Sequence, residues 1–264
     1  MMSGAIRLTQ NASIPELCDS LSRCTRAVLF LAICALIGGA MLTAPAFGNT
    51  LWVTGAAAQE GNFGLEVNME AATTDAAFVR DDNPSGEIVY RAQFWIDRTG
   101  GIYMDNDGGT KATRFVTFRA GDQNHDGGTS DVTVFRGIFG RLAVDNVDGP
   151  RYTFRLGCRQ DGGSFRYIGG IVLGELAKKK WVTIEWKAAS SPGANDGICR
   201  LYQGNTRNLA NPIGERTDLD NDLHQVDYVQ LGAVSGFTDN PQDPLTDGPL
   251  YYDTFESLRT LLVP

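Results

Sequence analysis

The first candidate for chemistry is a loop that carries oxygen-bearing side chains at alternate positions before a glycine. Asp122, Asn124 and Asp126 have this spacing, and their oxygens could wrap Ca²⁺, which takes about 6 to 8 oxygen ligands. Thr133 stands where an EF-hand loop carries a bidentate Glu, so the pattern is incomplete. Asp, Asn and Gly also form ordinary turns. The sequence therefore leaves open a calcium loop and a plain turn.

Signals for catalysis are weak. The two histidines, His125 and His224, do not stand at zinc-binding spacing, and the chain has no Gly-x-Ser-x-Gly elbow. It also lacks the Glu-x-Asp-x-x-Glu strand with which retaining glucanases place two carboxylates about 5 Å apart. The glutamates Glu87, Glu175, Glu185 and Glu256 are isolated from one another. We therefore expect that the protein is not an enzyme.

A ligand-binding surface is expected to show as aromatic side chains on the polar face of a strand. Trp95 lies in phase with Arg91 and Gln93, and an indole can stack on a sugar ring while planar polar groups bind its hydroxyls. Three residues of other predicted strands could extend this face across the same sheet: Arg155, Arg200 and Tyr202. We expect a shallow, concave glycan-binding face. The alternative is that Trp95 is covered by a loop or packs against a second sheet.

The elements that must position these residues are β-strands. Polar and apolar residues alternate from Tyr251 to Leu258 after a Gly-Pro turn, and from Ile88 to Asp97. The 31 glycines and the 13 Phe, 8 Tyr and 4 Trp suit strands joined by tight turns. Other expected strands include 113–119, 132–139, 151–159, 165–173, 181–187, 198–203 and 225–232. The pattern predicts an all-β chain, a two-sheet sandwich or jelly roll.

Four groups of residues together carry a family resemblance: 77–84 with 90–97, 181–189, 229–234 and 251–257. They resemble bacterial secreted domains of the concanavalin A-like, laminin-G-like jelly-roll class, over most of the chain from Leu65 to Arg259. The resemblance implies a two-sheet antiparallel β-sandwich with one concave sheet. That fold hosts lectins, glucanases, lyases and adhesive modules, so it does not choose a function by itself.

The N-terminal residues differ from the rest. An uncharged apolar run from Ala27 to Leu42 follows two arginines, and small residues precede a signal-peptidase site after Ala46. The predicted organisation is a helical signal peptide over 1–46, a linker over 47–60 and a jelly-roll domain over 61–264. An uncleaved anchor is the alternative, because 27–47 could span a bilayer of about 30 Å.

Cleavage of the signal peptide would leave Cys158 and Cys199, an even number of cysteines in an oxidising compartment. The two could form a disulfide, since both lie at apolar phases of predicted strands. Two separate buried thiols are the alternative.

The net charge of the chain limits which classes of molecule it is expected to bind. The formal net charge is −8, and an acidic surface repels phosphate backbones and anionic lipid. We expect no nucleic-acid partner and a mature domain that is not embedded in a membrane. Together these features predict a secreted, extracellular or periplasmic, non-catalytic binding module for extracellular or cell-surface glycan. The alternatives are a glycan hydrolase or lyase with an atypical site, and a structural or adhesive surface protein.

Overall fold

The structure is a computed structural model of the chain, and it describes residues 48–70, 75–104, 114–125, 130–142, 149–204, 211–236 and 246–260. The chain divides into two units, Met1–Ala46 and Phe47–Pro264. All described residues belong to the second unit, so the predicted signal peptide lies outside them, and its cleavage stays a prediction. Among the described residues, no helix has the length and hydrophobicity that crossing a bilayer requires.

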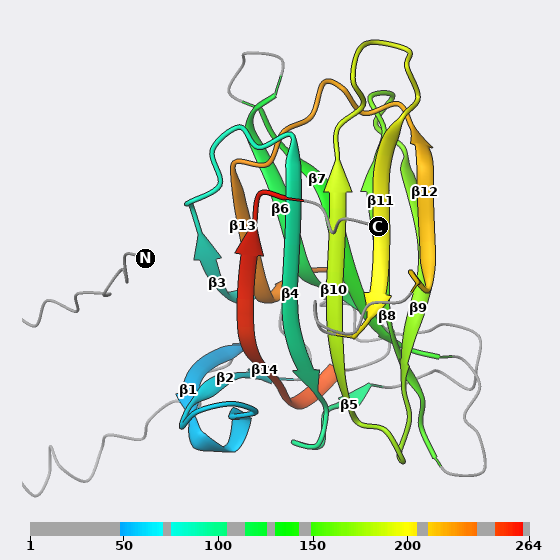
Figure 1. Cartoon of the computed structure of the whole chain (residues 1–264). Helices are drawn as coiled ribbons and strands as arrows, with labels where there is room; N and C mark the ends of the chain where they lie inside the picture. Colours follow the sequence, from blue (N-terminus) through cyan, green and yellow to red (C-terminus); the bar gives the residue numbers. More distant parts are fainter. Residues whose placement is uncertain are drawn as a thin grey trace, which may run out of the picture. The chain divides into compact units, whose positions relative to one another are not determined.

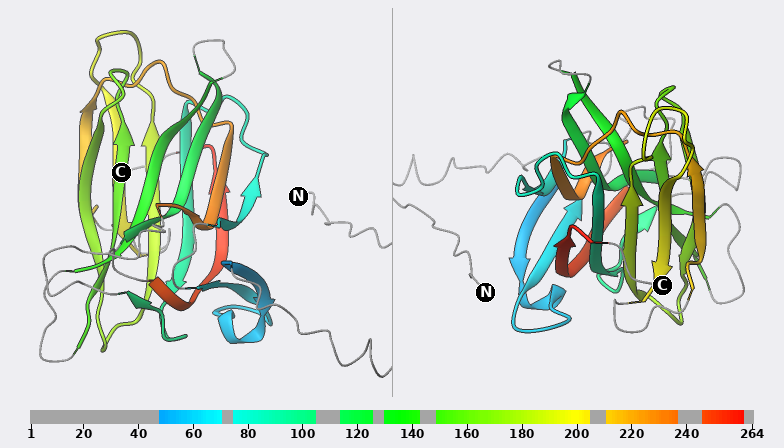
Figure 2. Two further views of the ribbon diagram at one scale, coloured as in Figure 1. Left: turned by 180° about the vertical axis from the view of Figure 1, so that it is seen from behind. Right: turned by 45° about the horizontal axis from the view of Figure 1, so that its top comes forward.

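The second unit consists of two antiparallel sheets that pack face to face (Figure 1, Figure 2). The eight-stranded sheet contains, in order across it, β1 (Thr50–Thr54), β2 (Gly64–Met69), β14 (Thr246–Leu258), β4 (Val89–Asp97), β10 (Lys179–Lys187), β11 (Gly197–Gln203) and β12 (Gly214–Leu219), while β5 (Tyr103–Met104) pairs with β14. The six-stranded sheet contains β3 (Ala77–Asp81), β13 (Tyr228–Ser235), β6 (Arg114–His125), β7 (Ser130–Arg141), β8 (Tyr152–Arg159) and β9 (Phe165–Leu173). The predicted all-β, two-sheet antiparallel sandwich is confirmed.

The core lies between the sheets and is built from one face of each strand. On β4, Tyr90, Phe94 and the two residues in phase with them are fully buried. The Phe94 ring stacks on Phe118 of the opposite sheet at 5.5 Å between centroids and meets Phe154 edge-on at 5.7 Å. Each such side chain contributes about 1.5–3 kcal/mol by leaving water. Because side chains alternate along a strand, this burial turns Arg91, Gln93 and Trp95 to the opposite, outer face.

A disulfide joins the two sheets. Cys158 on β8 and Cys199 on β11 are bonded, with 6.4 Å between their Cα atoms, and both side chains are fully buried. The bond links strands that are 41 residues apart in the sequence. It fixes the outer strands of the larger sheet against the smaller one.

Two segments differ from the sequence-based expectation. The range 47–60, expected to be a linker, contains β1 and a turn of 3₁₀ helix, η1 (Gly55–Ala57), and β1 pairs with β2 along its whole length. β12 is not among the strands expected from the sequence. Both are edge strands with mostly exposed or half-buried side chains, so they lack the strong apolar alternation that marks a strand in a sequence.

Candidate functional site

Five of the six predicted ligand-binding residues lie on the outer face of the eight-stranded sheet. Arg91, Gln93 and Trp95 project there from β4, and two more project there from β11: Arg200 and Tyr202. Arg155 instead lies on β8 in the six-stranded sheet, exposed, with its guanidinium 6.0 Å from the Tyr167 ring centroid. The prediction that Arg155 extends the same face is wrong, because strand periodicity does not tell which of two sheets a strand joins.

The register of β10 brings these residues together. β10 lies between β4 and β11, so Glu185 pairs with Arg91 on one side and with Arg200 on the other, while Thr183 pairs with Gln93 and Tyr202. Directly paired residues of antiparallel strands project from one face, about 4.5–5.5 Å apart at Cβ. We call these two neighbouring rows the outer-face cluster: Arg91, Gln93, Thr183, Glu185, Arg200 and Tyr202.

A buried carboxylate lies at the centre of the outer-face cluster. Glu185 is fully buried although it is on the outer face. The Tyr202 hydroxyl donates a hydrogen bond to Glu185 Oε2 at 2.9 Å, and Arg200 Nη1 lies 3.7 Å from the same oxygen. Burial, followed by the hydrogen bond and charge of Glu185, raises the pKa of Tyr202 to about 12. At neutral pH Tyr202 is therefore a phenol, and its hydroxyl points at the Glu185 side chain.

The two arginines of the cluster differ in their surroundings. Arg200 is engaged by carboxylates on both sides, since its Nε also lies 3.1 Å from Glu215 Oε2. Arg91 is half-buried, and within the described part of the chain its Nε is buried without a hydrogen-bond partner. A guanidinium can bind a carboxylate through two parallel N–H groups.

Trp95 lies beside the cluster and not in the contact between the sheets. It pairs with Trp181 across β4 and β10, and the two rings meet edge to face, 5.2 Å apart at 71°. Both indoles are half-buried. The outer face thus presents aromatic surface next to polar side chains, as a sugar-binding surface requires.

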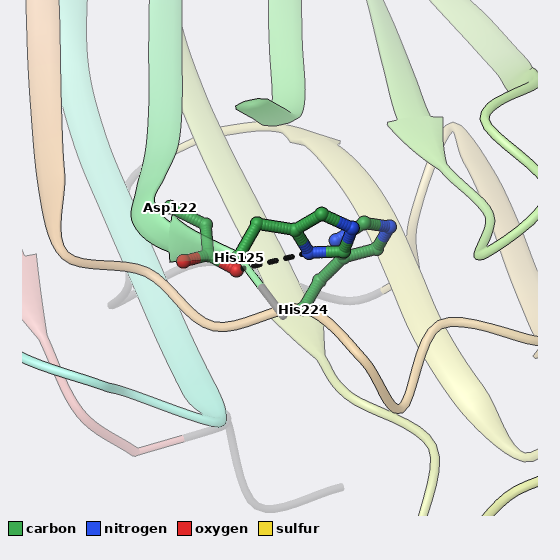
Figure 3. A group of neighbouring side chains, drawn as sticks. All are labelled: Asp122, His125 and His224. Atoms are coloured by element: carbon green, nitrogen blue, oxygen red, sulfur yellow. Dashed lines mark ion pairs between the residues drawn. The ribbon is translucent and has the colours of Figure 1, made fainter. Parts of the chain in front are cut away.

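The predicted calcium residues lie only partly within the described structure. Asp122 is buried near the end of β6, whereas the side chain of Asn124 and all of Asp126 lie outside the described residues. Asp122 instead lies beside His125 and His224 (Figure 3). Sequence spacing missed this group because His224 comes from the connection between β12 and β13, about a hundred residues after β6. Calcium binding stays a prediction.

Comparison with known proteins identifies no family: no family model and no curated protein matches the chain. Solved structures with a similar arrangement include an alginate lyase from Pseudomonas aeruginosa, with a TM-score of 0.45 and 8% identity over 74% of this chain and 82% of that one. A heptameric SAP-like pentraxin from Limulus polyphemus has a TM-score of 0.35 and 16% identity, covering 81% and 76%. The binding domain of botulinum neurotoxin serotype D/C has a TM-score of 0.38 and 10% identity, covering 83% and 46%.

The prediction that the protein is not an enzyme is corrected. Solved structures with a similar arrangement include alginate lyases, and one fold can carry both enzymes and binding modules. The prediction rested on the absence of known catalytic motifs and on carboxylates, Glu185 among them, that are isolated along the sequence. In the fold, Tyr202 and Arg200 lie against the Glu185 carboxylate, which is a contact that spacing along the chain does not reveal.

Proposed function

We propose that the protein acts on an acidic extracellular polysaccharide at the outer-face cluster and cleaves it by β-elimination. The observation that carries the proposal is the placement of Arg91 in register with the buried Glu185, whose carboxylate holds the Tyr202 hydroxyl. Arg91 can thus bind the carboxylate of a uronate sugar, and it lies beside Glu185 and Tyr202, which can transfer a proton. Elimination needs both, because the proton to be removed lies on the carbon next to that carboxylate.

The residues have distinct roles in this reaction. Arg91 and Gln93 bind the uronate carboxylate and so make the neighbouring carbon more acidic. As Glu185 takes the phenol proton, the Tyr202 oxygen takes the proton from that carbon. The electron pair forms a carbon–carbon double bond while the bond to the glycosidic oxygen breaks. Tyr202 then protonates the leaving oxygen, and Glu185 returns its proton to Tyr202. Glu185 is fully buried, so it acts through Tyr202.

The surroundings of the cluster support a polymer substrate outside the cytoplasm. Trp95 and Trp181 offer aromatic surface for a neighbouring sugar ring. The predicted signal peptide and the Cys158–Cys199 disulfide are typical of an oxidising compartment. The net charge of −8 opposes an acidic ligand at long range, so affinity rests on short-range contacts to Arg91 and the indoles.

The test is an incubation of the purified chain with alginate, pectate and hyaluronan, with a neutral β-glucan as the control polymer. We expect at least one uronate polymer to yield the ultraviolet absorbance of a newly formed double bond. Tyr202→Phe should lower the rate about 10²–10⁴-fold while binding persists. Tyr167→Phe, which removes a phenol on the other sheet, should leave the rate unchanged.

The outcomes separate recognition from cleavage. If the protein binds a uronate polymer but forms no unsaturated product, the proposed elimination reaction is contradicted. Only the proposed recognition of the polymer at this face would then be supported. Absence of both binding and product for every uronate polymer would overturn the whole proposal.

A further inference from the structure

We propose that Asp122, His125 and His224 form a binding site for one transition-metal ion, with Zn²⁺ as the preferred ion. The site is independent of the outer-face cluster. Asp122 and His125 lie near the end of β6, where the pairing with β7 shifts register between them. Such an irregularity re-aims side chains, and here the two side chains approach each other. His224 comes from the connection that runs from β12 in the larger sheet to β13 in the smaller one.

The distances suit an ion held by nitrogen and oxygen. His125 Nδ1 lies 3.5 Å from Asp122 Oδ2, and the rings of His125 and His224 stack with 4.7 Å between centroids (Figure 3). One ligand atom from each of the three residues lies within 4.8 Å of the others. Ligands bonded at about 2.1 Å to a tetrahedral Zn²⁺ are about 3.4 Å apart. A small inward movement would therefore complete three of four positions.

The ligand types favour zinc over the calcium expected from the sequence. Two imidazoles and one carboxylate suit Zn²⁺ and its neighbours in the transition series, whereas Ca²⁺ takes oxygen ligands. Asp122 and His224 are buried, and His125 keeps 13% of its side chain exposed. The ion would thus reach the site past His125, and a water molecule would take the fourth position.

The surroundings of His224 are those of a metal-ligating histidine. Its Nε2 lies 3.4 Å from the carbonyl oxygen of Gln160 and 3.7 Å from Asp161 Oδ1, so Nδ1 is the nitrogen that would bind the ion. A carbonyl or carboxylate on the second ring nitrogen fixes the tautomer and raises ligand basicity. Asp161 forms a group with Asp220 and Asp222, and these negative charges favour a cation nearby.

Hydrogen bonds hold the connection around His224 in place. The Asn221 side chain is fully buried, accepts from the Ala189 N–H at 2.9 Å and donates to the Lys187 carbonyl at 3.3 Å. The Gln225 N–H lies 3.4 Å from Asp122 Oδ2. These hydrogen bonds hold the three ligand residues close to one another. A bound ion would link β6 to the β12–β13 connection.

The experiment uses the full chain without a histidine tag, stripped with a chelator and then supplied with Zn²⁺, Ca²⁺ or Co²⁺. We expect one Zn²⁺ per chain, a higher melting temperature with Zn²⁺ than with Ca²⁺, and weak visible bands from bound Co²⁺ that Zn²⁺ removes. An intense near-ultraviolet sulfur-to-cobalt band would mean that cysteines hold the metal and would overturn the site. A melting temperature that only Ca²⁺ raises would also overturn it.

Variants locate the ion. His125→Gln, chosen because its ring is partly exposed, should lose the stoichiometric Zn²⁺ and the rise in melting temperature. Asp161→Asn should weaken Zn²⁺ binding about 10–100-fold. Asp218→Asn, an exposed carboxylate on β12, is the matched control and should bind Zn²⁺ like the parent. Unchanged Zn²⁺ content in folded His125→Gln contradicts the proposal; should that variant not fold, absence of the Co²⁺ bands in the parent contradicts it.

Discussion

At the scale of single residues, the burial of Glu185 determines what its neighbours can do. A buried carboxylate is costly unless it is paired and hydrogen-bonded, and here Tyr202 and Arg200 supply both. Burial and then this contact raise the pKa of Tyr202. The two residues therefore act as one unit, in stability as well as in the proposed reaction.

Tyr202 should make the protein less stable at high pH. The pKa of Tyr202 is about 12 in the fold against an ordinary value of 10.0, so the folded state holds the phenol proton more tightly than the unfolded state. Its contribution is complete below about pH 10 and is lost as the pH rises through about 12. Urea unfolding at a series of pH values should show a smaller alkaline loss for Tyr202→Phe than for the parent. Equal losses in the two proteins would contradict the assignment; Tyr103→Phe, at an exposed ring, is the control.

Trp95 should contribute directly to glycan binding. Replacing it by Ala removes aromatic surface beside Trp181, and a loss of about 1.4 kcal/mol corresponds to a tenfold weaker Kd. Titration calorimetry with the polymer that the parent binds measures the change. Trp52→Ala, at an exposed indole on β1, should bind as the parent does. A Trp95→Ala protein with unchanged affinity would remove Trp95 from the site.

At the scale of elements, the disulfide between β8 and β11 should stabilise the fold. A loop of this length gives about 4 kcal/mol in the chain-entropy treatment. The Cys158→Ala/Cys199→Ala double variant should lose about 2–4 kcal/mol of unfolding free energy in urea. A reductant should destabilise the parent and leave the double variant unchanged. An equal effect of the reductant on both would show that another cysteine is responsible.

The approach of β7 to the core depends on Gly137. A Cβ atom there would lie 2.3 Å from the ring of Phe154, which is fully buried. Gly137→Ala should therefore cost about 1–3 kcal/mol, because a well-packed core has little room to shift. Gly162→Ala, in the turn between β8 and β9 where nothing lies within 4 Å, is the matched control. Thermal melting of the two variants should separate them, and equal midpoints would contradict the packing argument.

At the scale of the whole molecule, the fold brings together residues that are far apart in the sequence. It does so in two ways. Within the larger sheet, β10 lies between β4 and β11, and this order creates the outer-face cluster. Between the sheets, the β12–β13 connection carries His224 to the end of β6. The first arrangement concerns the proposed glycan chemistry and the second the proposed metal clamp, so each can be tested without the other.

The sequence alone determined the class of fold and the faces of the strongest strands. Alternation with a period of two identifies a half-buried strand and shows which of its side chains share a face. This pattern alone predicts that Trp95 shares a face with Arg91 and Gln93. The same local signal was weak for β1 and β12, because edge strands bury little apolar surface.

Only the tertiary structure decided which strands are neighbours. Pairing and register arise from contacts between residues far apart in the chain, which local periodicity does not encode. This is why the sequence does not show that Arg155 lies in the other sheet, or that Glu185 and the two histidines have neighbours far along the chain. The register of β10 pairs Glu185 with Arg200 and brings it within hydrogen-bond distance of Tyr202, and the crossing between sheets places His224 against His125. Both proposed sites consist of such long-range pairs.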